Sequence, residues 1–437
     1  MSSHLWQNWS GLAQARPTSV SSPRNVHDVV TAVQHALETG SGVKMPGSGH
    51  SFTAVAKPEG ALLRPDQLTG ILDVDREAMT VTVAAGTQLH ALNDALESLG
   101  LSLHNMGDIA EQTIAGATST GTHGTGGLVA SLSAQIAGLE LVTGTGEVLH
   151  AHDGENADVL HVARLGLGAL GIITAITLQV EPLFTLEAHE FPLRWDAALA
   201  TFDQRAEDNQ HFEMYWFPHT DRVLAKENNR VLDDSDDLPG PLPRWRRLLD
   251  DEFLSNTVFG LVNRLGNARP SLIPRINDLS GRALSDRRYS DVPHRVFTSP
   301  RRVVFREMEY AVPREAGLHA LRDVRAWIEQ SGLRISFPIE VRVAPSDDIP
   351  LSTSSGRDSM YLAFHMNRQT DHTAYFAGVE EILKGYDGRP HWGKLHSRTA
   401  GDLEPTYPEW HTFQSLRDRL DPQRLFGNGY LRRVLGD

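Results

Sequence analysis

Hydrophobic and polar residues recur with two different periods along the chain, and these periods predict both helices and strands. Apolar residues appear at helical spacing over residues 22–37 and 89–99, and a glycine closely follows each segment. Residues 80–86 instead alternate with period two and are rich in Thr and Val, which predicts a half-buried strand. Further short strands are predicted at 43–45, 61–64 and 71–75. Because adjacent strands outnumber strands separated by helices, we predict an α+β fold.

The pattern changes near residue 182. A hairpin is predicted over 138–149 and a strongly apolar strand over 172–180, which ends at Glu181-Pro182. After residue 182 the predicted strands contain more aromatic residues, and the predicted helices contain more charged residues. Strands are predicted at 214–218, 301–312, 337–343 and 361–367, and helices at 315–332 and 407–420.

This change in pattern predicts two domains. We expect a first domain at 1–182, a second domain at 183–390 with an antiparallel sheet and flanking helices, and a segment at 391–437 that returns to the first domain. Residues 225–300 carry no recognisable chemistry, and we expect surface helices and loops there, with an acidic, Pro-containing loop over 233–243.

Composition narrows the classes of function. A chain of 437 residues exceeds a comfortable single core, and its 40% hydrophobic and 22% charged residues are typical of a folded protein. The net charge of −14 argues against a nucleic-acid partner. The absence of cysteine excludes disulfides, thiolate metal sites and cysteine nucleophiles. Neither a signal peptide nor an apolar run long enough to span a membrane is present, so we expect a cytoplasmic protein, and a monomer.

Residues 45–52, Met-Pro-Gly-Ser-Gly-His-Ser-Phe, form the first candidate binding motif. Gly47 and Gly49 permit a tight turn whose backbone N–H groups can surround an anion, with His50 at its edge. A second motif runs from Asn105-Met106-Gly107-Asp108 to a stretch with five glycines between residues 116 and 127. It lacks the Lys-Ser/Thr of a P-loop, and the first motif lacks the third glycine of the Rossmann fingerprint.

Later strands supply candidate side chains for chemistry. Glu340 and Arg342 lie two residues apart and therefore share one face of a strand, as do His365 and Asn367. Lys394 follows in the segment His391-Trp392-Gly393-Lys394. The simpler alternatives are an ion pair between Glu340 and Arg342, a packed aromatic turn around Trp392, and a structural hydrogen bond from His123. No histidine spacing calls for a metal.

Together these motifs, with Gly-Leu-Gly-Ala-Leu-Gly-Ile-Ile at 166–173, resemble the aldonolactone oxidase and alditol oxidase branch of the vanillyl-alcohol oxidase flavoprotein superfamily. The resemblance covers nearly the whole chain and implies a PCMH-type FAD-binding domain followed by a substrate (cap) domain. It further implies that FAD is bonded covalently through an imidazole nitrogen of His50. The other cofactor-binding residues that it implies are Pro46, Gly47, Ser48, Gly49, Ser51, Phe52, Gly107, Asp108, Thr113, Gly116, Ser119, Thr120, Gly121, Thr122, His123, Gly124, Gly126, Gly171, Ile173 and Lys394.

The resemblance also implies a reaction. Glu340 and Arg342 would orient the substrate, Asp108 and Asn367 would contact it, and His365 or Lys394 would handle the hydroxyl proton. His365 has a near-neutral unperturbed pKa, and Lys394 could assist if desolvation and cationic neighbours depress its pKa. His365 is the favoured group for the proton, and Lys394 would lie near the pyrimidine edge of the flavin and stabilise the anionic reduced ring. The expected substrate is a sugar-1,4-lactone of the D-arabinono or L-gulono type, with dioxygen or another electron acceptor.

Two alternatives stay open at this point. One is an alditol oxidase acting on xylitol or sorbitol, in which the position of Asp108 holds a serine. The other is a flavin-binding protein without turnover, which would have no use for Glu340, Arg342, His365 and Lys394. A small residue at Gly107 leaves room for dioxygen beside the flavin.

Overall fold

The computed structural model describes residues 5–126, 128–231, 239–243, 269–298 and 303–437. Its first part contains a small parallel sheet in the order β3 (Val20–Ser21), β5 (Ala61–Leu63) and β4 (Val43–Lys44), covered by helix α1 (Val26–Thr39). Asn25 caps the start of α1 by accepting a hydrogen bond from the N–H of Asp28, and Gly40 ends it with φ 62°. The helix and strands here follow the predicted pattern.

An antiparallel sheet of five strands completes the first part. Its order is β10 (Val148–His152), β9 (Ile136–Val142), β11 (Ile172–Gln179), β7 (Thr80–Ala84) and β6 (Ile71–Asp75). Helices α2 (Leu89–Ser98), α3 (Ile114–Ser119) and α4 (Ala157–Ala163) accompany it, and a short pair joins β8 (Leu101–Ser102) to β12 (Glu181–Pro182).

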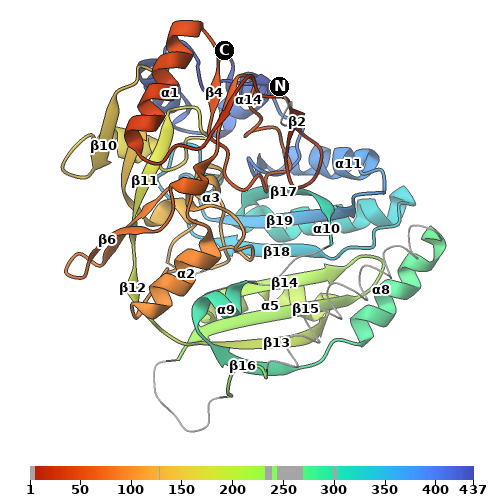
Figure 1. The fold of residues 1–437 in the computed structure, drawn as a ribbon. Coiled ribbons are helices and arrows are strands. Elements are labelled where there is room, and N and C mark those ends of the chain that lie inside the picture. Colours follow the sequence, from red (N-terminus) through yellow and green to blue (C-terminus); the bar gives the residue numbers. More distant parts are fainter. Residues whose placement is uncertain (1–4, 127, 232–238, 244–268, 299–302) are drawn as a thin grey trace.

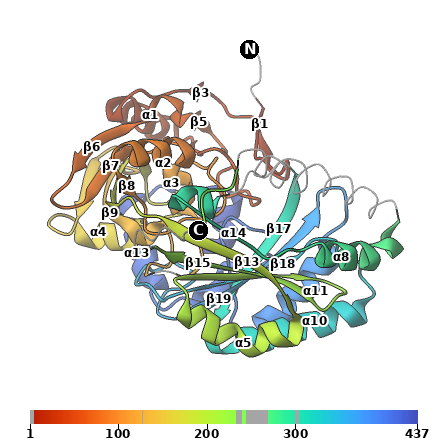
Figure 2. The same ribbon diagram turned by 90° about the horizontal axis from the view of Figure 1, so that it is seen from below.

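The second part is built on one antiparallel sheet of eight strands (Figure 1). Three helices, α5 (Trp195–Asp208), α10 (Arg314–Ser331) and α11 (Thr373–Lys384), pack on one face of this sheet, and Figure 2 shows α5 and α10 along its underside. The strand order is β16 (Arg287–Asp291), β13 (Leu186–Arg194), β15 (Arg222–Arg230), β14 (His211–Phe217), β18 (Ile339–Ala344), β19 (Ser359–Asn367), β17 (Phe305–Pro313) and β20 (Arg389–Pro390).

Every residue of β18 and β19 is buried, so both faces of the sheet centre are covered. The even-numbered side chains of β14 and β19 and the odd-numbered side chains of β18 belong to the hydrophobic cluster under the helices. The opposite set faces the first part of the molecule. This second face carries the polar residues that the candidate site requires.

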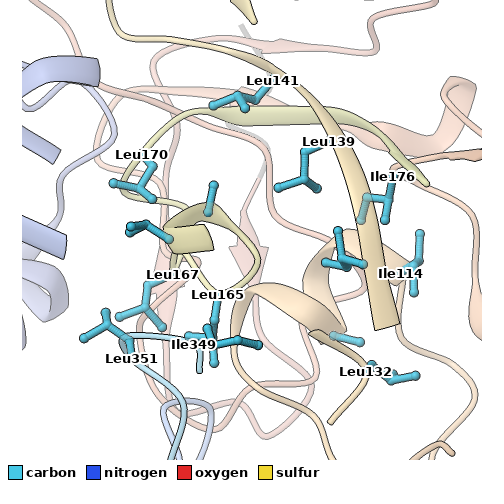
Figure 3. Packing of buried hydrophobic residues seen from close by; sticks show 14 of the residues in the cluster. Ile114, Leu132, Leu139, Leu141, Leu165, Leu167, Leu170, Ile176, Ile349 and Leu351 are labelled. Carbon is cyan, nitrogen blue, oxygen red and sulfur yellow. The ribbon is translucent and has the colours of Figure 1, made fainter. Parts of the chain in front are cut away.

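The chain returns to the first part after β20. Helices α12 (Ala400–Leu403), α13 (Trp410–Leu420) and α14 (Gly429–Leu435) contribute to the same hydrophobic cluster as α2, α3 and α4. Asn428 secures this return by donating to the carbonyl oxygens of Ala54 and Val55 at 3.1 and 2.9 Å. Ile349 and Leu351, from the loop after β18, also enter this cluster beside Leu165 and Leu167 (Figure 3).

The largest departure from the sequence prediction lies in residues 225–300. We expected surface helices and loops, and α8 (Ile273–Arg282) and α9 (Pro293–Phe297) are helices, but β15 and β16 are strands of the large sheet. The sequence of β15 is Arg-Val-Leu-Ala-Lys-Glu-Asn-Asn-Arg. Polar side chains occupy several of its inward-facing positions, so the alternation of apolar and polar residues that marks a strand is missing. Lys226, for example, donates to the carbonyl oxygen of Val296 at 3.0 Å.

Other parts of the predictions fall on residues that the structure does not describe. Most of the expected acidic loop at 233–243 lies outside the described residues, as do residues 301–302 of the strand expected from 301. The described strand β17 begins at Phe305. Among the helices of the described segments, none combines the length and the apolar character that crossing a membrane requires.

The core under α5 and α10 should depend strongly on Trp216, whose side chain is fully buried. We expect Trp216→Ala to lower the free energy of unfolding of this domain by about 3–5 kcal/mol, because it leaves a large cavity. Leu279→Ala, at a residue that is 70% exposed, should change it by about 0.5 kcal/mol or less. Urea unfolding followed by circular dichroism measures both; equal losses in the two variants would contradict this description of the core.

Candidate active site

Two adjoining cavities lie beside the glycine-rich loops: the first lies among these loops in the first part of the molecule, and the second lies between them and the large sheet. The first has a volume of about 100 Å³ and the second about 280 Å³. The side chains or backbones of His50, Ser51, Gln112 and Thr120 line both cavities, so the two spaces meet at the turn that carries His50. A long ligand can therefore lie in the first cavity and present one end to the second.

The turn at residues 46–52 has a shape that only glycine permits. A Cβ atom on Gly47 would lie 2.1 Å from Oγ1 of Thr113, and Gly49 has φ 73°. The C-terminal segment supports the turn, because the N–H of Phe52 donates to the carbonyl oxygen of Gly393 at 2.7 Å. Local glycines and a segment more than three hundred residues later in the sequence thus fix the position of His50 together.

The first cavity suits a dinucleotide. It is lined by hydroxyls and glycine backbone, and the buried amine of Lys44 stands in its wall and donates to the carbonyl oxygen of Gly168 at 3.0 Å. Burial lowers the pKa of Lys44 to about 7, an effect that the charge of Asp421 partly offsets. The residues of the predicted cofactor set that line this cavity are Pro46, Gly47, Ser48, Gly49, His50, Ser51, Thr113, Gly116, Ser119, Thr120, Gly171 and Ile173.

Three predicted cofactor residues lie outside both cavities: Gly121, Gly124 and Gly126. A Cβ on Gly124 would lie 2.3 Å from Oδ1 of Asn105, and one on Gly126 would lie 2.3 Å from the carbonyl oxygen of Gln210. Their small size therefore allows this loop to pack tightly against its neighbours. Glycine-rich sequence is typical of phosphate loops and of close-packed loops alike, so the sequence did not distinguish the two.

The imidazole of His50 is half-buried where the two cavities meet. Burial lowers the pKa of His50 below 6.5, the nearby Glu111 opposes this effect, and Lys394 adds to it. The ring is therefore neutral at physiological pH, which is the state in which an imidazole nitrogen is a nucleophile.

One face of the large sheet forms the wall of the second cavity. Glu307 and Glu309 lie two apart on β17, and Glu340 and Arg342 lie two apart on β18. Ala363 of β19 pairs with Glu340 on one side and with Glu309 on the other. Because paired residues in antiparallel strands project to the same face, these side chains line one surface with a small alanine between them.

Arg342 is the centre of the first charged cluster. Its guanidinium lies 2.5 Å from Oε1 of Glu340, 2.8 Å from Oε2 of Glu213 and 3.8 Å from Oδ2 of Asp108. Tyr215 donates to Glu340 at 3.0 Å. Burial alone would lower the pKa of Arg342, but the three carboxylates raise it well above its ordinary value. Glu340 and Arg342 therefore belong to a buried network of charges. The simpler alternative from the sequence, an ion pair between these two residues alone, does not describe it.

Lys394 is the centre of the second cluster. Its Nζ lies 2.5 Å from Oε2 of Glu307, whose Oε1 lies 3.4 Å from Nε2 of His365. Burial would lower the pKa of Lys394, but Glu307 and Glu309 raise it, so Lys394 stays cationic. The condition under which Lys394 could act as a base, a depressed pKa, is thus not met.

His365 and Asn367 do not line the second cavity. His365 lies behind Glu307, packed against the rings of Phe305 and Phe337 at centroid distances of 5.1 and 6.2 Å. Asn367 accepts a hydrogen bond from the N–H of Gln369 at 2.9 Å. The alternation of side chains along a strand correctly places His365 and Asn367 on the same face of β19. The cavity does not extend along that face as far as these two residues.

Glu309 belongs to a third cluster with His123 and His391. Nε2 of His123 lies 3.0 Å from Oε1 of Glu309, and Nδ1 lies 2.8 Å from the carbonyl oxygen of Gly124. Burial opposes ionisation of Glu309, but its interaction with His123 and the charge of Lys394 hold its pKa at about 2. Burial lowers the pKa of His391 to about 4, so its ring is neutral.

These three side chains are close enough to bind a metal ion, since their ligand atoms lie within 4.8 Å of one another. The hydrogen bonds favour a different arrangement. The N–H of Gly393 donates to Nδ1 of His391 at 3.0 Å, so Nε2 of this neutral ring carries the proton and has no lone pair for a metal. The cluster therefore acts as a set of hydrogen-bonding groups in the cavity wall.

Of the predicted set, the second cavity brings together His50, Ser51, Phe52, Gly107, Asp108, Thr120, Thr122, His123, Glu340, Arg342 and Lys394. Sequence reasoning missed Glu307 and Glu309, although the alternation of Phe305-Arg306-Glu307-Met308-Glu309 contains the same signal that identified Glu340 and Arg342. It also missed Trp9, Gln112 and Phe305, which no motif marked.

Comparisons with known proteins agree on one family. Residues 176–434 match the family model described as D-arabinono-1,4-lactone oxidase, and residues 17–152 match an FAD binding domain. The chain is 42% identical over 434 residues to L-gulono-1,4-lactone dehydrogenase of Mycobacterium tuberculosis, covering 99% of this chain and 100% of that protein. It is 31% identical to L-gulonolactone oxidase of Scyliorhinus torazame, covering 99% and 98% of the two chains.

A more distant relative and a solved structure extend the comparison. The chain is 30% identical to alditol oxidase of a Streptomyces species, covering 98% of each protein. The crystal structure of cholesterol oxidase from B. sterolicum superposes with a TM-score of 0.84 at 19% identity, covering 99% of this chain and 96% of that one. This last likeness shows the fold, an FAD-binding domain followed by a substrate domain.

The buried network around Arg342 generates a stability prediction. We expect Arg342→Met to lower the free energy of unfolding by about 3–5 kcal/mol at pH 7, because Glu340 and Glu213 stay buried without their cation. Arg288→Met, which removes a largely exposed partner of Glu187, is the matched control and should cost about 1 kcal/mol or less.

The pH dependence of this loss follows from Glu213. Burial raises the pKa of Glu213, but Arg342 and Lys226 hold it below its ordinary value of 4.5. The stability that this group contributes is therefore present above pH 4.5 and is lost as the pH falls through the lowered pKa. Unfolding curves should show that the difference in unfolding free energy between the wild type and Arg342→Met becomes smaller below pH 4.5. A difference that grows on acidification would contradict the network.

Proposed function

The chain belongs to the D-arabinono-1,4-lactone oxidase family and is an FAD-dependent oxidoreductase, and on this premise we propose that it oxidises a secondary alcohol of a sugar-1,4-lactone. D-Arabinono-1,4-lactone and L-gulono-1,4-lactone are the substrate types that the named relatives suggest. FAD, when bound, supplies the electron-accepting ring that takes a hydride from the substrate carbon.

The observation that carries this proposal is the charge pattern of the second cavity. Five carboxylate side chains line it, against the cations Arg342 and Lys394. Against the effect of burial, Lys394 and His365 keep Glu307 ionised and His123 keeps Glu309 ionised, while Glu340 pairs with Arg342. The glutamates of the sheet face therefore accept hydrogen bonds and repel anions. Such a wall suits a neutral ligand with many hydroxyls, which describes a sugar lactone. The five carboxylates are Asp108, Glu111, Glu307, Glu309 and Glu340.

The residues divide into binding and proton-handling groups. Arg342 offers fixed donors to the lactone oxygens, and Glu340 accepts from a hydroxyl. Lys394 stays cationic and stabilises negative charge beside the ring of the cofactor. The hydroxyl proton reaches His365 through Glu307, which lies between His365 and the cavity. His365 thus acts through a carboxylate and does not contact the substrate directly.

We further propose that His50 carries FAD covalently. It stands at the junction of the cofactor cavity and the substrate cavity, and its neutral ring is a competent nucleophile. The cofactor's diphosphate and adenine would then occupy the first cavity, where glycine backbone, hydroxyls and the buried Lys44 are available as hydrogen-bond donors.

Two features of the second cavity bear on the choice of substrate and acceptor. Asp108 lies 3.8 Å from Arg342 and adds an acceptor to the wall that a serine, expected in the alditol-oxidising branch, would replace by a neutral hydroxyl. This difference favours a lactone over an alditol. Gly107 lines the second cavity, and its small size would leave room there for dioxygen. A larger residue would also crowd the loop, because a Cβ at this position would lie 3.0 Å from Cγ2 of Thr122 and 3.1 Å from the carbonyl oxygen of His123.

The charge pattern predicts discrimination by charge. A sugar-1,4-lactone should reduce the bound flavin under anaerobic conditions, whereas the open-chain aldonate of the same sugar should have a kcat/KM lower by about 100-fold or more, because carboxylates of the wall repel it. A neutral alditol of the same carbon number is open-chain like the aldonate but carries no charge, so it separates the effect of charge from that of shape. Its kcat/KM should lie between those of the lactone and the aldonate. Bleaching of the flavin absorbance measures all three; an aldonate that matches the lactone would overturn the proposed substrate class.

The covalent link predicts a simple chemical result. Acid precipitation of the wild-type protein should leave the yellow chromophore in the pellet, and a tryptic peptide containing His50 should carry the mass of FAD. His50→Ala should release all of its flavin into the supernatant, and flavin reduction by the lactone should slow by about 10-fold or more because the ring loses an electron-withdrawing bond. A wild-type pellet without colour would refute the link and leave FAD binding itself untouched.

A further inference from the structure

The amino-terminal hairpin is built around one buried asparagine. Strands β1 (Trp6–Gln7) and β2 (Gln14–Ala15) pair antiparallel, and the N–H of Asn8 donates to the carbonyl oxygen of Ala13 at 3.0 Å. The side chain of Asn8 closes the same loop, because its Oδ1 accepts from the N–H of Ala13 at 3.0 Å. The loop is therefore fixed although the strands are only two residues long.

The same asparagine connects the hairpin to the turn that carries His50. Its Nδ2 donates to the carbonyl oxygens of Ser51 and Phe52 at 2.9 and 3.4 Å, and the side chain is 3% exposed. The N–H of Trp9 donates to the carbonyl oxygen of Gly49 at 2.8 Å. Hydrogen bonds from two adjacent residues of the hairpin, Asn8 and Trp9, thus hold the backbone on both sides of His50.

Trp9 then places its ring against the imidazole. The centroids of the Trp9 and His50 rings lie 5.7 Å apart with an interplanar angle of 25°, a stacked arrangement. Trp9 itself is held edge-on by Phe52 at 5.9 Å and by Phe305 at 5.6 Å. In the part of the chain that the structure describes, no hydrogen bond or ion pair involves the ring of His50, so this packing determines how the ring is oriented.

We propose that the hairpin is part of the active site, and that Trp9 is a positioning residue that orients the imidazole of His50 for covalent attachment of FAD. This inference rests on the proposed covalent link. A ring held in one orientation reacts faster than a freely rotating one, because its rotational freedom has been removed before the reaction. Trp9 also lines the substrate cavity, so the same side chain closes the space beside the attached flavin.

The attachment step sets the geometry that Trp9 must maintain. An imidazole nitrogen forms a bond to the 8α-methyl carbon of the flavin; this carbon loses one proton, and the imidazole loses its N–H proton. Two electrons stay in the flavin ring and take up two protons, so the flavin is reduced, and dioxygen or another two-electron acceptor oxidises it again. The nucleophile is the neutral ring, aimed along the new bond.

Removal of Trp9 should also change the pH dependence of attachment. Two charged groups face the imidazole: Glu111, from the loop before α3, raises its pKa, and Lys394, from the segment after β20, lowers it. Burial, to which Trp9 contributes, is the largest influence and lowers the pKa of His50. Exposure of the ring would therefore raise this pKa, and the decline of the attachment rate on acidification would begin at a higher pH.

The experiment measures attachment and binding separately. Wild-type protein and the variants Trp9→Ala, Trp9→Phe and Trp6→Leu are produced in a riboflavin-limited host and incubated with FAD. Flavin that stays in the acid pellet reports covalent attachment over time, and fluorescence quenching of FAD reports total binding. Trp6 lies in the same hairpin, but the ring that stacks on His50 is that of Trp9. Trp6→Leu is therefore the matched control.

We expect Trp9→Ala to slow attachment by about 10-fold with FAD binding changed by about 3-fold or less, and to shift the pH profile as described. Trp9→Phe should restore most of the rate, and Trp6→Leu should match the wild type. Attachment at the wild-type rate in Trp9→Ala would overturn the proposal. If Trp9→Ala does not fold, Trp9→Leu takes its place, because leucine keeps an apolar side chain but cannot stack on the imidazole. Attachment that is slower than in Trp9→Phe supports stacking, and attachment at the wild-type rate refutes it. Wild-type protein that holds FAD without a covalent bond refutes the proposed link, a result distinct from either.

Discussion

Burial of four glutamates on one face of a sheet is the constraint on which the rest of the structure depends. Glu213, Glu307, Glu309 and Glu340 are each at most 5% exposed, and without cations they would repel one another and resist ionisation. Arg342 and Lys394 supply the balancing charge and His123 is hydrogen-bonded to Glu309, and each of these three comes from a different part of the fold. The domains are therefore joined through charge as well as through hydrophobic packing.

This balance supports the class of ligand that we propose. The cavity contains hydrogen-bond acceptors fixed in place by cations whose own pKa values are raised, so its groups need little rearrangement when a neutral, hydroxyl-rich ligand enters. The cofactor turn meets this wall at His50, between the hairpin at the amino terminus and the segment around Gly393. Residues from both ends of the chain thus determine how the two cavities meet.

Sequence reasoning predicted the architecture and the part of the site that depends on patterns between neighbouring residues. Strand periodicity placed Glu340 and Arg342 on one face, and the glycine turn identified the position of His50. The partner of Glu309 is His123, at a separation of 186 residues, and no local pattern shows such a pair. His365 and Asn367 were assigned to the right strand face, but where the cavity ends depends on the packing of Phe305 and Phe337. The hairpin around Asn8 escaped notice because its strands have two residues each and the contacts that join it to the site are distant in sequence.

The most direct test of this account is a crystal structure of the FAD-loaded protein with a sugar-1,4-lactone bound under anaerobic conditions. The account predicts the lactone between the flavin and the sheet face, with its oxygens in contact with Arg342 and Glu340 and its reacting carbon near the ring beside Lys394. A lactone bound away from this face, or a flavin whose ring does not reach the cavity lined by Glu307 and Glu309, would contradict it.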